Sequence, residues 1–193
     1  LLGFNINFSI LKESGISLIS ISVISVFFGM LLIFLLCRTI LRLDKTVSIL
    51  VATGNSICGN SAIAAMASVI KSPSNHVASA ISFSAAIGLI QVIFLPILFT
   101  IMSITEFQYG VIAGLSVYAV PQVVAASFVI GNEAGLIATQ VKLLRVLMLG
   151  PLILMVGLFY KKDNAGVFSN NKISTYIPWF VVGFILASII GSV

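Results

Sequence analysis

Long apolar stretches separated by short polar breaks dominate the pattern of this chain. Residues 15–37 form a nearly uncharged stretch of about 23 residues, and a helix of that length spans the roughly 30 Å of hydrocarbon in a bilayer. Backbone groups in lipid must bond internally, and the apolar runs do not alternate as barrel strands do, so helices are expected. The pattern predicts six segments, at 15–37, 47–70, 76–103, 109–130, 134–160 and 176–193.

The composition places this pattern in a membrane protein. The chain is 60% hydrophobic and 8% charged, with a mean hydropathy of +1.22, far from the balance of a soluble domain. We therefore predict an all-α, polytopic transmembrane helix bundle that forms one domain over residues 1–193. Because Leu1 is not an initiator methionine and the last apolar run stops at Val193, we expect a fragment of a longer protein. Cys37 and Cys58 lie in apolar segments, which favours buried thiols over a disulfide framework.

Two polar linkers hold much of the positive charge. Linkers 38–46 and 161–175 are both net positive, so the positive-inside rule predicts a multi-pass protein of the cell inner membrane with both linkers in the cytoplasm. Four segments separate the two linkers. Both linkers can therefore lie on the same side of the membrane if all four segments cross it, or if an even number of them are re-entrant. The same count places the turns at 71–75 and 131–133 outside and the turn at 105–108 inside.

This orientation also accounts for the formal net charge of +5. The lipid bilayer is then the expected partner, and no nucleic acid is expected.

The sequence GNSICGNSA at positions 54–62 interrupts the second segment with small and polar residues. Glycine disfavours a continuous helix, and Ser and Asn side chains compete for backbone hydrogen bonds, so an unwound turn is predicted. The alternative is a continuous helix whose small residues pack against neighbours. A helix that restarts near Ser61 would direct free N–H groups at an anion, whereas unwound carbonyls and Asn side chains would suit a cation. The candidate substrate-binding residues here are Asn55, Ser56, Gly59, Asn60 and Ser61.

A second interruption is predicted in segment 109–130, around Pro121 and Gln122. Proline removes one helix hydrogen bond, and the Gln122 side chain offers a polar group beside the carbonyl that is freed. A simple proline kink is the alternative. Two polar breaks in different segments favour a site between them, so Gln122 is a further candidate substrate-binding residue.

Lys142 and Arg145 lie three residues apart, and hence on one helix face, within segment 134–160. Ionisable residues inside a membrane segment are costly and mark functional sites by default. No acidic residue lies at comparable depth in the sequence, so their partner is either a carboxylate elsewhere or a bound anion. Snorkelling or structural pairing is the alternative.

Small residues at four-residue spacing are expected to mark close helix contacts. The pairs and rows are Ser25–Gly29, Ala64–Ser68, Ala78–Ser82–Ala86 and Ser84–Gly88.

The sequence gives no support to an enzyme. It has no Ser/His/Asp set, no metal-ligand cluster and no paired carboxylates, and His76 alone is a weak signal for metal or proton chemistry. Neither a cofactor nor a metal ion is expected, and because these residues contain no nucleotide-binding domain, ATP drive within this chain is not expected either.

Several motifs resemble, in this order, the sulfate exporter family of prokaryotic inner-membrane proteins: GNSICGNSAIAAMASVIK, SVYAVPQVVAAS, GNEAG, KLLRVLMLGP and IPWFVVGF. The resemblance covers nearly the whole chain. It implies part of a transporter of about ten spans, related to the sodium/proton antiporters and bile-acid symporters, with inverted repeats and crossing broken helices. The family elements fall on residues 56–59, on residues 122–126 and on the basic pair Lys142 and Arg145. The family carries a His and an acidic residue before its Gln element, where this chain has Tyr118, Ala119 and Pro121.

The leading hypothesis is a secondary transporter that moves a small anion, sulfate or a sulfonate, by alternating access. A transporter of another solute coupled to sodium or protons is the first alternative, with the broken turn coordinating the cation. A non-transporting membrane subunit is the second. The candidate partners are thus the anion, a coupling ion and further copies of the chain.

Overall fold

The computed structural model of the protein describes residues 8–163, and within this range every regular element is an α-helix. This confirms the predicted all-α class. The predicted segment 176–193 and nearly all of linker 161–175 lie outside the described residues. The helices are α1 (Phe8–Thr39), α2 (Lys45–Ser56), α3 (Asn60–Ile70), α4 (Ser74–Met102), α5 (Glu106–Ser116), α6 (Val120–Ser127), α7 (Asn132–Leu147) and α8 (Leu149–Asp163).

Three stretches of helix in the described part are long and apolar enough to cross a membrane. They are Leu18–Thr39 of α1, Ser74–Met102 of α4, and Asn132–Gly157, which joins α7 to most of α8. α1 and α4 keep large apolar side chains exposed, among them Phe28 and Phe94. Such surfaces suit a lipid environment, as the composition predicts.

The two predicted interruptions are confirmed. α2 ends at Ser56 and α3 begins at Asn60, so the segment predicted at 47–70 is two helices and not one continuous helix. α5 ends at Ser116 and α6 begins at Val120, with extended backbone between them. Pro121 lies in the first turn of α6, where its missing N–H costs no hydrogen bond. The interruption is therefore a full break and not a proline kink.

α5 and α6 form a hairpin that returns to the end of the bundle from which it starts. The Tyr109 hydroxyl, near the start of α5, donates to the Ala126 carbonyl near the end of α6 at 2.8 Å. After α6, Gly131 lies directly against the Glu106 carboxylate at the start of α5. The turns at 105–108 and 131–133 therefore lie at the same end, and the prediction that they face opposite sides is wrong. Helix periodicity does not encode the direction in which a chain continues after a break.

The opposite end of the bundle gathers the starts of α2 and α4 with the end of α8. The ammonium of Lys45 lies 5.9 Å from the centre of the Tyr160 ring. Leu43 of the first linker lines a pocket with Ser79, near the start of α4. The turn at 71–75 that leads into α4 is thus at the end of linker 38–46 and not across from it, which corrects the predicted placement.

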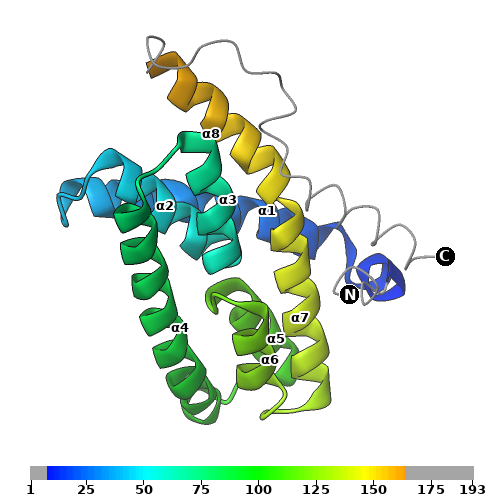
Figure 1. Cartoon of the computed structure of the whole chain (residues 1–193). Helices are drawn as coiled ribbons and strands as arrows, with labels where there is room; N and C mark the ends of the chain where they lie inside the picture. Colours follow the sequence, from blue (N-terminus) through cyan, green and yellow to red (C-terminus); the bar gives the residue numbers. More distant parts are fainter. Residues whose placement is uncertain (1–7, 164–193) are drawn as a thin grey trace.

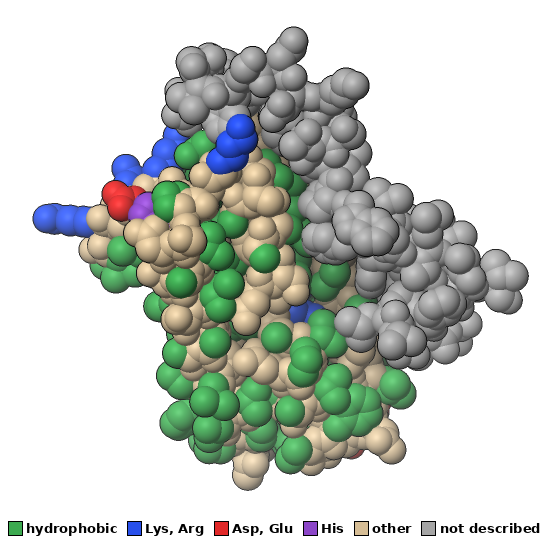
Figure 2. All heavy atoms as spheres, in the orientation of Figure 1, with side chains coloured by type: hydrophobic (Ala, Val, Ile, Leu, Met, Phe, Trp, Pro, Cys, Tyr) green, Lys and Arg blue, Asp and Glu red, His purple; other side chains and the backbone are tan. Residues whose placement is uncertain are grey.

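Figure 1 shows how this arrangement brings the breaks to the middle of the molecule. α3 lies beside α8 and the upper part of α4, and α6 lies between the lower parts of α4 and α7, with α5 packed along α7. α1 crosses behind and contacts both α2 and α7. Figure 2 shows the Lys and Arg side chains mainly at the upper left, and mostly uncharged atoms on the lower half of this face.

A close helix contact joins α5 to α7 through small residues. A Cβ added to Gly110 would lie 2.8 Å from the Ala134 carbonyl, and one added to Gly114 would lie 2.6 Å from the Ala138 carbonyl. Small residues four apart let two backbones approach this closely. The predicted row Ser84–Gly88 is also buried in a contact, whereas the row Ala78–Ser82–Ala86 is exposed.

Candidate functional site

The two helix breaks, at residues 57–59 and 117–119, meet each other against α4, and we call the place where they meet the junction. A Cβ added to Gly59, in the first break, would lie 3.4 Å from Cβ of Tyr118 in the second break and 3.2 Å from Oγ of Ser84 on α4. Tyr118 and Ser84 are both buried. The expectation that the two breaks face a common site agrees with this contact between segments far apart in the sequence.

Gly59 makes the close contact because of its backbone conformation. Its φ of +70° is one that residues with a Cβ rarely adopt. In this conformation its N–H donates to the Gly54 carbonyl at 2.8 Å, which closes the end of α2, and the chain then turns into α3. The glycine thus ends one helix and starts the next within three connecting residues.

Arg145 on α7 joins the C-terminal ends of α2 and α5. Its Nε donates to the Ser56 carbonyl at 3.0 Å, and Nη2 donates to the carbonyls of Asn55, at 3.2 Å, and of Ser56. Nη1 donates to the carbonyls of Gly114, at 3.4 Å, and of Leu115. The last carbonyls of a helix have no partner within the helix, and a cation there is stabilised by the helix dipole. A guanidinium has five N–H groups, so these five contacts occupy the whole group.

Lys142 lies one turn earlier on α7 and donates a hydrogen bond to the backbone of the second break. Its Nζ donates to the Val117 carbonyl at 2.6 Å, and the side chain is 0% exposed. An ammonium has three N–H donors, and this is the one hydrogen bond that its ammonium makes to the described residues. Lys142 therefore keeps donors for a further acceptor at the junction.

The junction carries a positive charge that no described carboxylate neutralises. Neither Lys142 nor Arg145 forms a salt bridge within residues 8–163. Two helices end here and two begin, so their terminal charges of about −0.5 and +0.5 each roughly cancel. The two basic side chains then leave about two positive charges when both are protonated. Such a region attracts an anion and repels a cation.

Gln122 caps the start of α6 from within its own first turn. Its Oε1 accepts a hydrogen bond from the backbone N–H of Ala119 at 3.1 Å. The side chain lies against Gly88 of α4, where an added Cβ would collide with it. Gln122 therefore lies at the junction, and its oxygen already accepts one hydrogen bond there.

The other predicted residues lie around the first break in different surroundings. The Ser56 hydroxyl is buried, has no hydrogen-bond partner among the described residues and lies near Gly29 of α1. Asn55 is half-buried, and Asn60 and Ser61 are exposed in the first turn of α3. The structure thus brings the backbone of this run to the junction, together with Gly59, while the side chains of Asn60 and Ser61 reach the surface.

Three contributors to the junction were not predicted as site residues. Ser84 and Gly88 were assigned only to helix packing, and Tyr118 only to the break. The signal that could have identified Ser84 and Gly88 is the small-residue row of α4, since two backbones that break at one place need small neighbours there. The carbonyl partners of Arg145 had no signal, because carbonyl groups are the same in every residue.

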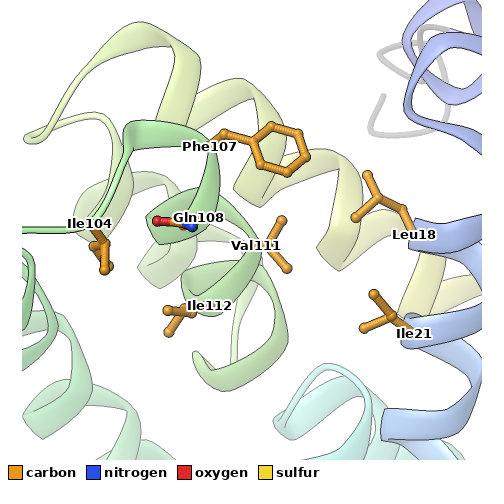
Figure 3. A pocket seen from close by; sticks show the side chains of 7 residues that line it. All are labelled: Leu18, Ile21, Ile104, Phe107, Gln108, Val111 and Ile112. Carbon is orange, nitrogen blue, oxygen red and sulfur yellow. The ribbon is translucent and has the colours of Figure 1, made fainter.

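A separate pocket of about 470 Å³ lies between α1 and α5. Figure 3 shows Leu18 and Ile21 of α1 facing Val111 and Phe107 of α5 across it. Its one polar side chain, Gln108, accepts a hydrogen bond from the Thr105 N–H. This pocket is apolar, so it does not compete with the junction as a site for an ion.

No group of three or more His, Cys, Asp or Glu residues within 8–163 is placed to hold a metal ion. The junction itself presents buried cations, helix ends and hydroxyl groups.

Comparison with known proteins places the chain in a family of membrane proteins. A family profile described as "Conserved hypothetical protein 698" matches residues 1–193. The chain belongs to this family. No solved structure matches it.

Curated membrane proteins align with nearly the whole length of the chain. The chain is 43% identical to the UPF0324 membrane protein blr3189 of Bradyrhizobium diazoefficiens, over 96% of the chain and 53% of that protein. It is 41% identical to the UPF0324 membrane protein BH02290 of Bartonella henselae, over 100% of the chain and 54% of that protein. It is 34% identical to the UPF0324 inner membrane protein YeiH of Escherichia coli K12, over 100% of the chain and 55% of that protein. The chain therefore spans about half the length of the curated relatives that it matches.

Proposed function

We propose that the protein is a secondary transporter that carries a small anion through the junction of the two helix breaks by alternating access. The observation that supports this most strongly is the charge of Lys142 and Arg145, which no carboxylate within residues 8–163 neutralises, beside two helix starts. Broken helices that meet inside a bundle are typical of secondary transporters, and helix N-termini bind anionic groups. The role is transport and not catalysis.

The residues divide into contacting and positioning roles. Lys142 contacts the anion through the donors that Val117 does not use, together with backbone N–H groups in the first turns of α3 and α6. Arg145 contributes charge and holds the helix ends in place, because its own donors are occupied. Gln122 fixes the start of α6.

The membrane location and orientation follow the same account. A relative from Escherichia coli is named an inner membrane protein, and we place this protein in the cell inner membrane as well. Linkers 38–46 and 161–175 face the cytoplasm, since the end of the bundle that holds Lys45 and Tyr160 is the basic one. The resemblance to the sulfate exporter family makes sulfate or a sulfonate the first substrates to test.

Anion binding to the purified complete protein tests the proposal. We expect sulfate or methanesulfonate, added at constant ionic strength and sodium concentration, to raise the midpoint of thermal unfolding, because a ligand at 100 times its Kd stabilises by about 2.7 kcal/mol. The variant Lys142→Gln should lose this shift. An equal shift with sodium chloride alone, or no shift with any anion, would overturn the assignment and favour cation coupling or a non-transporting subunit.

A further inference from the structure

The carbonyl groups around Arg145 have the form of a cation site built from two helix ends. Four residues contribute them, Asn55 and Ser56 from α2 and Gly114 and Leu115 from α5. Each pair comes from the last turn of a helix, where carbonyl oxygens point away from the helix and carry its negative terminal charge. In transporters with broken helices, carbonyls at such ends are ligands for bound sodium.

In this protein the side chain of Arg145 fills the cation position between the four carbonyl groups. Arg145 is 3% exposed, and all of its hydrogen bonds to the described residues go to these four carbonyls. A guanidinium is planar and presents its donors as a rigid fork, so one group bridges both helix ends where a compact ammonium would reach fewer oxygens. The neighbouring Lys142 donates to the Val117 carbonyl, which is not one of these four.

We propose that these four carbonyl groups form a binding site for a monovalent organic cation, that Arg145 occupies it as a tethered ligand, and that a free guanidinium ion occupies it when Arg145 is shortened. The junction therefore needs no bound sodium to hold its two breaks together. This inference concerns the assembly of the junction and does not depend on which solute is carried.

Chemical rescue of the complete protein in detergent tests the inference. Arg145→Ala removes the cation and leaves space of its shape. We expect the midpoint of thermal unfolding to fall by at least about 5 °C, because carbonyls from two helix ends lose their partners. Guanidinium chloride at about 20 mM, far below denaturing concentrations, should restore half of the loss or more.

Three controls separate this site from general effects. Urea has nearly the shape of guanidinium but no charge, and sodium and potassium have the charge but not the fork, so at the same concentration each should restore less than a quarter as much. Arg145→Lys keeps a tethered cation in place, so guanidinium should not stabilise it. Arg38→Ala removes an arginine that donates to the Leu43 carbonyl at an exposed site, and guanidinium should have no effect there.

Wild-type stability of Arg145→Ala, or equal rescue by urea or sodium, would overturn the inference. If Arg145→Ala is not recovered after extraction, extraction in guanidinium should restore its yield, and failure to do so would equally overturn it. Because the readout is stability, guanidinium rescue without any anion effect would sustain this inference while the proposed transport of anions fails.

Discussion

The Nε atom of Arg145 donates to the carbonyl of Ser56, 89 positions earlier in the chain, at 3.0 Å. The same guanidinium also donates to the Leu115 carbonyl in the last turn of α5, just before the second break. One side chain on α7 therefore fixes the ends of two helices that belong to different broken segments. This contact explains why the breaks lie side by side and why a buried cation exists without a carboxylate partner in the described residues.

The conformation of Gly59 should be essential to the junction. In Gly59→Ala the added methyl group meets a φ of +70° as well as the Ser84 hydroxyl at 3.2 Å. We expect a loss of about 1–3 kcal/mol of stability and a matching loss of anion binding. Thermal unfolding and binding measured on the same samples check both.

Gly29→Ala is the matched control for this substitution. Its added methyl group meets only the Ser56 hydroxyl, at an ordinary 3.6 Å. Stability and binding should stay near wild type. An equal loss in the two variants would show that the first result is a general effect of filling space between helices.

The close contact of α5 with α7 should not tolerate larger side chains. Gly114→Val places its side chain against the Ala138 carbonyl and Val141, so we expect about 1–3 kcal/mol of destabilisation from overpacking. The control Val111→Leu enlarges a residue that lines the open pocket on α5 and should change stability by less than about 0.5 kcal/mol. Unfolding midpoints that fall equally in both would contradict the close approach of the two helices.

The local features of the fold follow from the sequence, and the long-range ones do not. Gly59 with its polar neighbours, and Pro121, predicted both breaks, because glycine and proline act on the backbone where they stand. The return of α6 beside α5 could not be predicted, since it depends on the contact between Tyr109 and Ala126. Spacing alone also did not distinguish the buried Ser84 from the exposed Ser82.

The sequence singled out the two basic residues, but it did not predict their hydrogen-bond partners. Lys142 and Arg145 stood out because ionisable residues inside a membrane segment are costly. Their hydrogen-bond partners are backbone carbonyls such as that of Val117, which only the folded arrangement reveals. The expectation of either a carboxylate or an anion as partner did not consider helix ends.

The hairpin of α5 and α6 makes a prediction about sidedness. Single cysteines at Ser72 and at Glu133, in the complete protein with Cys37, Cys58 and any further cysteines replaced, should lie on opposite sides of the membrane. We expect a membrane-impermeant maleimide added to intact cells to label position 133 and to label position 72 only after permeabilisation. A cysteine at Thr105 should behave like position 133, and labelling of 105 and 133 from opposite sides would contradict the hairpin.

The fit of Gln122 against α4 should matter for the site. Gly88→Val would push the Gln122 side chain away from the Ala119 N–H that it caps. Loss of such a cap costs about 1 kcal/mol, and we expect weaker anion binding because the start of α6 loosens. Ala86→Val, on the exposed side of α4, should leave binding unchanged, and the comparison is made by equilibrium binding of radiolabelled sulfate.

In the proposed function, the junction carries an anion by means of the charge of Lys142. The most direct measurement is counterflow of radiolabelled sulfate and methanesulfonate in sodium-free vesicles that contain the complete protein, compared with Lys142→Gln. We predict saturable exchange by the wild type and at least about a tenfold loss in the variant, which corresponds to about 1.4 kcal/mol. Exchange that is equal in both proteins, or that occurs only when sodium or a pH gradient is supplied, would contradict the account.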